Sequence, residues 1–283
     1  MADELKKGLT DALAKPVYED VFQPSARFVG TALAETVRMA LKPVRFGVWG
    51  LDQAMNYAGN RVCEILGHIP PDHIIPTNPA LAGPAIQAIR YSSDEAREMY
   101  ARLIAASMVK QSAPKAHPSF VEIIRQLTPD EAKILALFAK ANVFPIVDLR
   151  SEEKRRPDDK FGLKVSGWNL LQNYSLLGVQ AGCEFPKQAS AYIDNICRLG
   201  LAHIPEGRVT DDKFYEAILN DHTFLATQQS IDLNGSRASR VIPKRLEITA
   251  FGQEFRETCI PRDGVFRASP ADQVAQAAQE PNR

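Results

Sequence analysis

Three side chains with metal-binding chemistry lie near one another in the first third of the sequence. Cys63, His68 and His73 are spaced five residues apart, and Asp72 stands beside the last of them. Thiolates and imidazoles are common metal ligands, and a proline-rich turn can bring such residues to one point. The interpretation that we favour instead places Cys63 in the core and both histidines on the surface of a loop. We therefore expect no metal and no cofactor.

A second candidate for chemistry is His117, which lies in a loop between Lys115 and Pro118. A loop histidine can act as a general base, but no Cys, Ser or Asp stands at a telling position beside it. We favour the alternative that the ring caps the helix that follows. No P-loop, GxGxxG, GxSxG, HExxH or zinc-finger spacing occurs in the chain. We assign no catalytic residue, and an enzyme with an unrecognised site is the third of three functional hypotheses.

A basic face near the start of the chain suits contact with an anionic surface. Arg27, Arg38 and Lys42 fall within an arc of about 60° if successive residues turn by about 100° on a helix. Apolar residues occupy the other side of this predicted helix. A basic stripe beside an apolar face is typical of helices that lie on anionic membranes. An ordinary core helix with a solvated basic face has the same pattern, and we favour that interpretation.

A second basic group lies in the segment SRASRVIPKR, which contains no acidic residue. We call Arg237, Arg240, Lys244 and Arg245 the C-terminal basic group. Such side chains make the phosphate contacts of nucleic-acid-binding proteins. The helix expected at 186–199 exposes few basic residues, and the net charge of the chain is zero. Nucleic-acid binding is therefore the less favoured hypothesis.

The elements that would position these residues are mostly helices. Apolar residues recur at helical spacing over 24–42, 44–66, 93–109 and 119–127. The five prolines of 68–84 indicate an irregular connector between the second and third of these helices. The sequence Thr128-Pro129-Asp130-Glu131 then combines an N-cap residue, a proline at the first helical position and a capping box. It predicts a helix that begins at Pro129 and marks a domain boundary.

The pattern changes after this junction. It predicts in order a helix ending near 142, a strand over 144–149, a charged loop over 151–160, helices over 166–179 and 186–199, a strand over 201–204, a helix over 210–219 that Thr210 caps, a strand over 244–249 and a last helix over 251–259. This order is similar to that of a winged helix whose wing, over about 205–243, contains a helix. We therefore predict a mostly α protein with a small β component. It has a helical N-terminal domain over 1–127, a winged-helix-like C-terminal domain over 128–260 and a disordered tail over 261–283.

The composition is that of an ordinary soluble protein of 283 residues, 45% hydrophobic and 24% charged. The first residues mix acidic and basic side chains, so we predict no signal peptide. The sequence contains no apolar run of about 20 residues, so we predict no membrane-spanning helix. The four cysteines form no CxxC pair, which is typical of reduced residues in a cytosolic protein. We predict a cytoplasmic protein, and the basic face allows a peripheral position on the inner membrane.

Several long stretches of the sequence form a recognisable set. They are VYEDVFQPSARFVG (17–30), LKPVRFGVWGLDQ (41–53), GPAIQAIRYSSDEAREMYARLIAASM (83–108), AHPSFVEIIRQLTPDEAKIL (116–135) and the later YIDNICRLGL and ITAFGQEF. Together these stretches resemble the Abi-alpha family, named for abortive infection. The resemblance implies a bacterial, intracellular protein of phage defence, and it assigns no chemical role to any residue. The leading hypothesis is a non-catalytic defence protein that acts through an unidentified protein partner, a phage trigger or an anionic membrane. The alternative is a winged-helix transcriptional regulator that binds nucleic acid.

Overall fold

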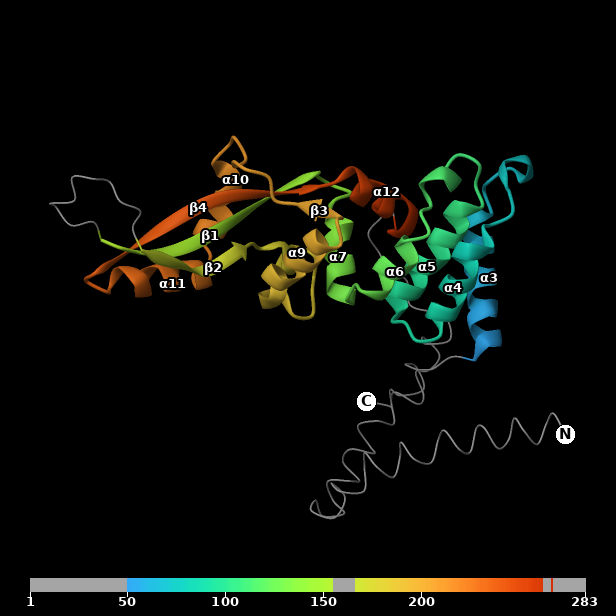
Figure 1. The fold of residues 1–283 in the computed structure, drawn as a ribbon, viewed down its shortest axis with the longest axis horizontal. Helices are drawn as coiled ribbons and strands as arrows, with labels where there is room; N and C mark the ends of the chain where they lie inside the picture. Colours follow the sequence, from blue (N-terminus) through green and yellow to red (C-terminus); the bar gives the residue numbers. More distant parts are fainter. Residues whose placement is uncertain (1–49, 155–165, 262–265, 267–283) are drawn as a thin grey trace, which may run out of the picture. The chain divides into compact units, whose positions relative to one another are not determined.

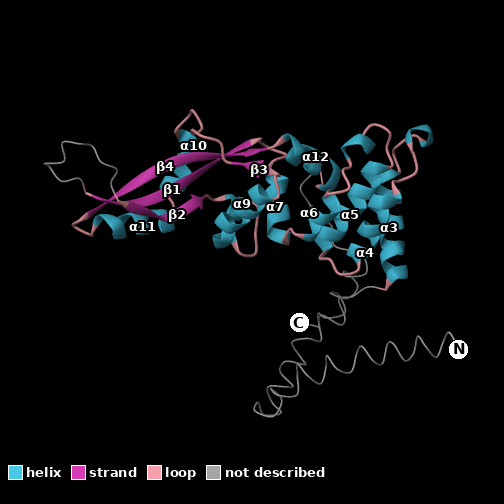
Figure 2. Ribbon diagram, viewed as in Figure 1, coloured by secondary structure: helices cyan, strands magenta, loops and turns pink. Residues whose placement is uncertain are grey.

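The computed structural model describes residues 50–154, 166–261 and 266 (Figure 1). Contacts divide the chain into two units between Gly50 and Leu51. The second unit is mostly helical with one small antiparallel sheet, as the sequence predicts (Figure 2). The helix expected at 24–42 lies outside the described residues, as does the tail apart from Pro261 and Phe266.

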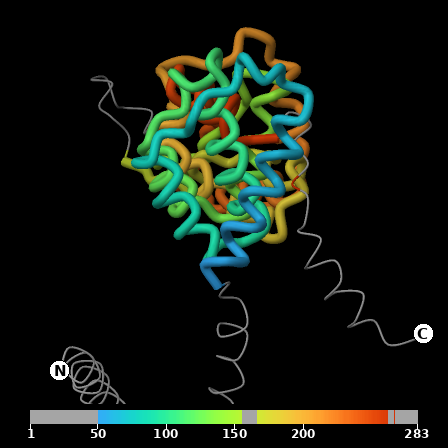
Figure 3. The backbone as a smooth tube through the Cα atoms, turned by 90° about the vertical axis from the view of Figure 1, so that its right-hand side faces the viewer, coloured from blue at the N-terminus to red at the C-terminus, as the bar shows by residue number. Residues whose placement is uncertain are grey.

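The first part of this unit is a group of helices packed around α5. In chain order its elements are α3 (Leu51–Leu66), η1 (Pro71–His73), α4 (Pro79–Ile89), α5 (Asp94–Ser107), η2 (Ala113–Lys115) and α6 (Phe120–Arg125). Met99, Tyr100 and Leu103 of α5 are fully buried, and α5 contacts α3, α4 and α6. In the view of Figure 3, which looks at the helical end of the unit, α3 is the blue tube in front. The buried stripe of α5 thus forms the core of the helical part.

Helix α4 corrects the expectation of an irregular connector over 68–84. Pro79 occupies the first helical position, where a missing N–H costs nothing, and the Asn78 side chain accepts a hydrogen bond from the Ala80 N–H. Leu81, Ala85 and Ile89 form a buried stripe, which stabilises the helix although Pro84 lies inside it. The prolines of the connector therefore start a helix as well as interrupting one.

The second part begins with α7, where the capping-box prediction is confirmed. The Glu131 N–H donates to Thr128 Oγ1 at 3.3 Å, and the Thr128 N–H donates to the Glu131 carboxylate at 2.7 Å. The helix ends at Leu137, earlier than expected. The elements that follow α7 (Pro129–Leu137) are β1 (Val143–Glu153), β2 (Gly167–Tyr174), α8 (Leu177–Gln180), η3 (Pro186–Gln188), α9 (Ala189–Arg198), β3 (Ala202–His203), α10 (Lys213–Leu219), α11 (His222–Asp232), β4 (Arg237–Ile248) and α12 (Ala250–Cys259).

Within the described residues the sheet has four antiparallel strands in the order β2-β1-β4-β3. β1 pairs with β4 along its whole length, from Val143 opposite Glu247 to Glu153 opposite Arg237. Two predictions are wrong in this region: residues 166–179 are not one helix, because Gly167–Tyr174 pairs with β1, and the charged loop begins beyond Glu153. Pairing with a distant strand overrides the local apolar spacing. β4 likewise begins at Arg237 and not at 244.

Helices α10 and α11 cover one face of this sheet. They bury Tyr215, Ile218, Phe224 and Ile231 against Val147 and Leu149 of β1. The predicted helix over 210–219 begins at Lys213 without a side-chain cap, so the role given to Thr210 is wrong. Helix α11 is absent from the sequence-based prediction. It begins after Asp221, whose carboxylate accepts hydrogen bonds from two amides of its first turn.

Helix α12 joins the two parts of the unit. Its Gly252 lies so close to the chain after α9 that an added Cβ would stand 1.9 Å from the Leu201 carbonyl oxygen. Gly200, with φ of 75°, ends α9 in the left-handed conformation that glycine adopts freely. The rings of Phe251 and Phe255 pack on Phe120 of α6, with centroids 5.0 and 5.2 Å away. The YIDNICRLGL and ITAFGQEF stretches therefore meet one another at this junction.

Candidate functional site

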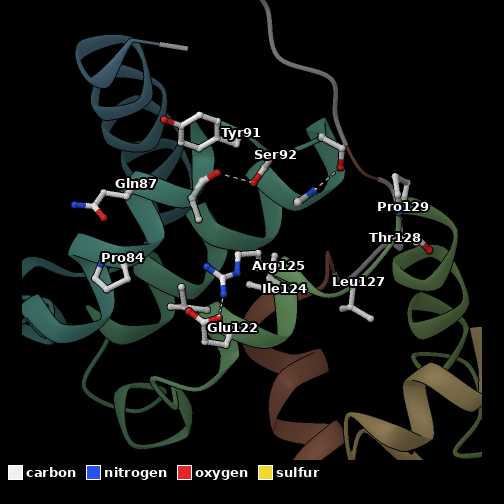
Figure 4. Close-up of a pocket in the computed structure, with 14 residues that line it drawn as sticks. Pro84, Gln87, Tyr91, Ser92, Glu122, Ile124, Arg125, Leu127, Thr128 and Pro129 are labelled. Atoms are coloured by element: carbon white, nitrogen blue, oxygen red, sulfur yellow. Dashed lines mark hydrogen bonds and ion pairs between the residues drawn. The ribbon is translucent and has the colours of Figure 1, made fainter. Parts of the chain in front are cut away.

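A hollow of about 600 Å³ lies between α4, α5, α6 and the start of α7 (Figure 4). Its lining comes from 84–96 and 121–129, inside the two longest stretches that carry the family resemblance. These stretches are far apart in sequence order but close in the fold, because α6 packs against both α4 and α5. We call this space the hollow.

The inner wall of the hollow is apolar and rigidly placed. Val121 and Ile124 of α6 are buried, and Pro84 and Ala88 of α4 lie across from them. The Tyr100 hydroxyl of α5 donates to the Val121 carbonyl oxygen at 3.2 Å, which fixes α6 on α5. Burial raises the pKa of Tyr100 well above its ordinary value, so the phenol keeps the proton that it donates. The apolar wall that α6 contributes is therefore held on α5 by this hydrogen bond.

Three hydroxyl side chains around the hollow make hydrogen bonds within the protein. Ser92 Oγ donates to the Ala88 carbonyl oxygen at 2.7 Å (Figure 4), and Ser93 Oγ accepts from the Ala96 N–H at the start of α5. Thr128 Oγ1 accepts from Glu131 as the cap of α7. In this arrangement the two serines and the threonine stabilise helix ends. The inner wall of the hollow is apolar, and the polar groups lie around its rim.

Two pairs of side chains lie at or beside the rim of the hollow. Glu122 and Arg125 form an ion pair at 2.7 Å on successive turns of α6. Tyr91 is exposed at the α4–α5 turn, and the Arg90 guanidinium lies 5.3 Å from its ring centroid. Tyrosine and arginine are enriched in protein interfaces because each combines an apolar body with hydrogen-bonding groups. Tyr91 and Arg125 therefore place two residue types common in interfaces at the rim.

The start of α7 connects the hollow to α9. Asp130, next to the lining residue Pro129, is buried and accepts hydrogen bonds from the Glu184 N–H at 2.8 Å and the Phe185 N–H at 2.9 Å. The Tyr192 hydroxyl of α9 donates to the same carboxylate at 3.1 Å. Burial disfavours the charged carboxylate, but these donors outweigh it, so the pKa of Asp130 lies below its ordinary value. One wall of the hollow is thus fixed to the second part of the unit.

The model of the family described as abortive infection alpha matches residues 51–259 of this chain. The chain belongs to the abortive infection alpha family. The resemblance seen in the sequence is therefore confirmed over 51–259, whereas the stretch 17–30 and most of 41–53 lie outside the matched region. The hollow lies wholly inside it. No curated protein matches the chain.

One solved structure is similar to part of this family member. It is an uncharacterized protein from the hydrocarbon-degrading marine bacterium Alcanivorax borkumensis SK2, 20% identical, with a TM-score of 0.31. The likeness covers 52% of this chain and 97% of that one. Among the described residues of the present family member, no helix is long and apolar enough to cross a membrane.

The metal-ligand candidates do not form a site in the described part of this family member. No group of three or more His, Cys, Asp or Glu residues there could hold a metal ion, so Cys63, His68 and His73 do not converge. The expectation that Cys63 is a core residue is wrong, because α3 buries Ala54, Ala58, Val62 and Leu66 and leaves Cys63 exposed.

His117 does not cap the first turn of α6 as expected, because no side chain caps that helix. Its Nδ1 accepts a hydrogen bond from the Ser119 N–H at 3.2 Å, immediately before α6. The imidazole also packs against the rings of Phe120 and Phe251, each with its centroid 6.0 Å away. The histidine therefore satisfies an amide at a helix start and fills the junction with α12.

Lys244 of the C-terminal basic group lies in a polar network inside the sheet. Its ammonium donates to both oxygens of Asp148, at 3.0 and 3.1 Å, and to the Asn173 side-chain oxygen. Asn173 has a φ of 51° at an irregularity in the β1–β2 pairing, and its N–H donates to Asp148 at 2.8 Å. The three protons of the ammonium therefore have three acceptors, and the lysine stabilises the bulged end of β2.

The three arginines of the C-terminal basic group also have partners within the protein. Arg237 donates to Ser151 and lies with its guanidinium carbon 3.8 Å from the centroid of the Trp168 ring. Arg240 forms an ion pair with Glu152 at 3.2 Å, and Arg245 with Glu247 at 2.6 Å. The other predicted basic face, Arg27, Arg38 and Lys42, lies outside the described residues.

The hollow is not apparent from the sequence, although the start of α7, which forms part of one wall, is. The capping box at Thr128 predicts where α7 begins, and the helical spacing over 93–109 predicts α5, whose cap is Ser93. Neither signal indicates that the two helix starts face the same space. That proximity depends on α4, whose prolines argue against a helix when only the sequence is considered.

Proposed function

We propose that this protein acts in abortive-infection phage defence by binding an apolar segment of a protein partner or phage trigger in the hollow, without catalysis. Membership of the abortive infection alpha family supports the link to defence. The observation that carries the binding proposal is the hollow itself, which is built from the two longest family stretches. Its volume falls within the range of about 300–1,000 Å³ that is usual for binding pockets.

The geometry supports apolar binding better than chemistry at this place. The hydroxyls of Ser92, Ser93 and Thr128 stabilise helix ends, and the carboxylate of Glu122 is paired with Arg125. A buried apolar wall with an aromatic rim can take one or two apolar side chains of a partner, which removes their surface from water at about 25 cal/mol per Å². The connection through Asp130 to α9 would let an occupant stabilise both parts of the unit.

A phage challenge tests this proposal. Infected cells with the gene should die early and release fewer phage than cells without it, and unchanged plaque counts across a broad phage panel would refute the defence role. Gln87→Trp, an exposed position of the lining, should fill the hollow and abolish protection. Asn60→Trp, exposed on α3 and outside the lining, is the matched control and should protect normally. Equal protection by the two variants would reject the hollow as the site.

We also propose that 128–260 is an elaborated winged helix and that 1–127 is a separate helical domain. The order α7, β1, α9, β3, β4, α12 keeps part of the predicted arrangement, although β2 and the short α8 replace the helix predicted over 166–179. The antiparallel pairing of β4 with both β1 and β3 also supports this interpretation. The insertions are β2 with α8, and α10 with α11 in the wing. A nucleic-acid-binding regulator is the alternative function, and it is less favoured because the C-terminal basic group has partners inside the protein.

Membrane contact through Arg27, Arg38 and Lys42 is a second route by which a cytoplasmic defence protein could act. Each basic residue near an anionic surface contributes on the order of 1 kcal/mol. The full chain should then sediment with anionic vesicles and much less with neutral ones, and changing the three residues to Gln should remove this binding. A variant that is released from vesicles yet still protects cells would exclude membrane contact as the mechanism.

A further inference from the structure

The outer edge of β2 is an open sheet edge in the described part of the chain. β2 is the first strand in the order β2-β1-β4-β3, and β1 is its single neighbour among the described strands. Trp168 is 56% exposed and Leu170 is 41% exposed, next to exposed Asn169 and Gln172. α9 contacts β2, and Ser190 Oγ donates to the Asn173 carbonyl oxygen near the end of the strand. The exposed segment therefore runs from Trp168 to Gln172.

The other long edge of the sheet is blocked by side chains. Asp232 of α11 accepts hydrogen bonds from the Ser239 N–H at 2.8 Å and from Ser239 Oγ at 2.9 Å. β3 pairs with the last residues of β4. Natural proteins protect sheet edges in this way because a free edge pairs with other strands. β4 is thus protected at Ser239 and at its last residues, whereas β2 is an end strand of the described sheet.

At two positions of β2 the backbone N–H and C=O groups point away from β1. The Glu153 N–H donates to the Ser166 carbonyl oxygen, and Ser151 lies opposite Trp168. Because inward and outward groups alternate along an antiparallel ladder, Gly167 and Asn169 turn their N–H and C=O groups away from β1. These groups are the ones that an added strand would bond.

Charge decides which strand fits this edge. β1 carries Asp148, Arg150, Glu152 and Glu153, and β4 carries five charged residues, whereas the β2 sequence GWNLLQNY has none. Edge strands that avoid association usually carry a charged residue, often lysine. An uncharged strand can lie antiparallel to its own copy without placing like charges opposite one another. The zero net charge of the chain also removes long-range repulsion between two copies.

We propose that two copies of this chain associate by antiparallel pairing of β2 with β2 over Gly167–Gln172, which would join their sheets into one. Six residues span about 20 Å, the length of an ordinary strand. Across the two-fold axis the exposed Trp168 and Leu170 of each copy would pack on the other strand. This association goes beyond the proposed function, since it uses none of the residues of the hollow.

Light scattering of the purified full chain over a dilution series tests the proposal. We expect twice the chain mass at high concentration and dissociation on dilution. Leu170→Lys introduces the charge that protected edges carry, and it should give the mass of one chain throughout. Leu233→Lys, at an exposed leucine at the end of α11, is the matched control and should leave the dimer intact. A wild-type chain that stays monomeric, or a dimer that Leu170→Lys leaves intact, overturns the proposal.

Hydrogen exchange keeps the test decisive if Leu170→Lys fails to fold. In the wild type, exchange at the Gly167 and Asn169 amides should slow as the dimer forms, while the Trp168 amide, which faces β1, should change less. Exchange at these two amides that is independent of concentration in a dimeric sample would place the contact elsewhere and refute β2 pairing. This result does not depend on plaque counts, so the dimer proposal and the binding proposal for the hollow are tested independently.

Discussion

Removal of the Glu98 carboxylate should be among the most damaging single changes in the helical part. Glu98 lies on α5 with its side chain 1% exposed. It accepts hydrogen bonds from Arg61 Nε at 2.7 Å and Nη2 at 2.9 Å, and from Arg102 Nε at 2.7 Å. One buried carboxylate therefore holds two guanidinium groups, one of them from α3. Glu98→Ala leaves both arginines without this partner.

The cost follows from what happens to the two arginines. Loss of one partner of a buried ion pair costs about 3–5 kcal/mol, because the remaining charge stays desolvated. The side chains of Arg61 and Arg102 are 14% and 23% exposed, and Arg61 keeps its contact with Glu64. These features let the charges regain some water, so we expect the lower limit, about 3 kcal/mol. In a domain of this size such a loss lowers Tm by roughly 6–12 °C.

Urea denaturation followed by circular dichroism measures this loss as a lower midpoint at an unchanged slope. Glu122→Ala on α6 is the matched control, because Glu122 pairs with Arg125 at the exposed rim of the hollow. Exposed pairs contribute well under 1 kcal/mol, so the control should change the midpoint little. The double variant Arg61→Met/Glu98→Met should be more stable than the sum of the two single losses predicts, because it leaves fewer charges buried. Equal losses for Glu98→Ala and Glu122→Ala would refute this reasoning.

Three further predictions concern α7 and the C-terminal basic group. Thr128→Ala should lower the free energy of unfolding by about 1 kcal/mol, and an unchanged denaturation midpoint would reject the role of this cap. Because the folded pKa of Asp130 is lowered, its ionisation stabilises the fold above the unfolded pKa and this contribution is lost as pH falls below it. Asp130→Asn should therefore be destabilised relative to the wild type at neutral pH, and the difference should shrink below about pH 4 in denaturation curves; a difference independent of pH would contradict this. Duplex DNA should bind weakly or not at all, and tight, salt-sensitive binding that is lost when the C-terminal basic group is changed to Ala would reverse our ranking of the two functions.

The elements that were predictable are those whose signals are local. The capping box at Thr128 gives the start of α7, and Gly200 gives the end of α9, because each acts on amides or carbonyls within one helical turn. The same holds for α5, α6 and α12, whose cores and start regions lie within one short stretch of sequence. The mostly α fold with a small sheet follows from these signals.

The strands were harder to predict because their partners are distant. Gly167–Tyr174 has apolar residues at spacings that also suit a helix, and only pairing with β1 makes it a strand. The first half of β4 has the composition of a basic loop, yet it pairs with β1 from Glu153 to Leu149, more than eighty residues earlier in the chain. The hollow was unpredictable for a similar reason, since its walls come from two separate stretches that α4 brings together.

The C-terminal basic group shows how strand geometry changes the meaning of a charge pattern. As a segment without acids it indicates a phosphate-binding surface, which requires that its four side chains reach one ligand. On a strand, side chains alternate between faces, so Arg240 and Lys244 point to one side of the sheet while Arg237 and Arg245 point to the other. The first face meets Asp148 and Glu152 of β1, and on the second Arg237 stacks on Trp168. The four basic side chains are thus split between the two faces of the sheet, and they contact acidic or aromatic partners on neighbouring strands. This arrangement suits cohesion of the sheet better than contact with a phosphate backbone. For this reason we rank protein binding above nucleic-acid binding.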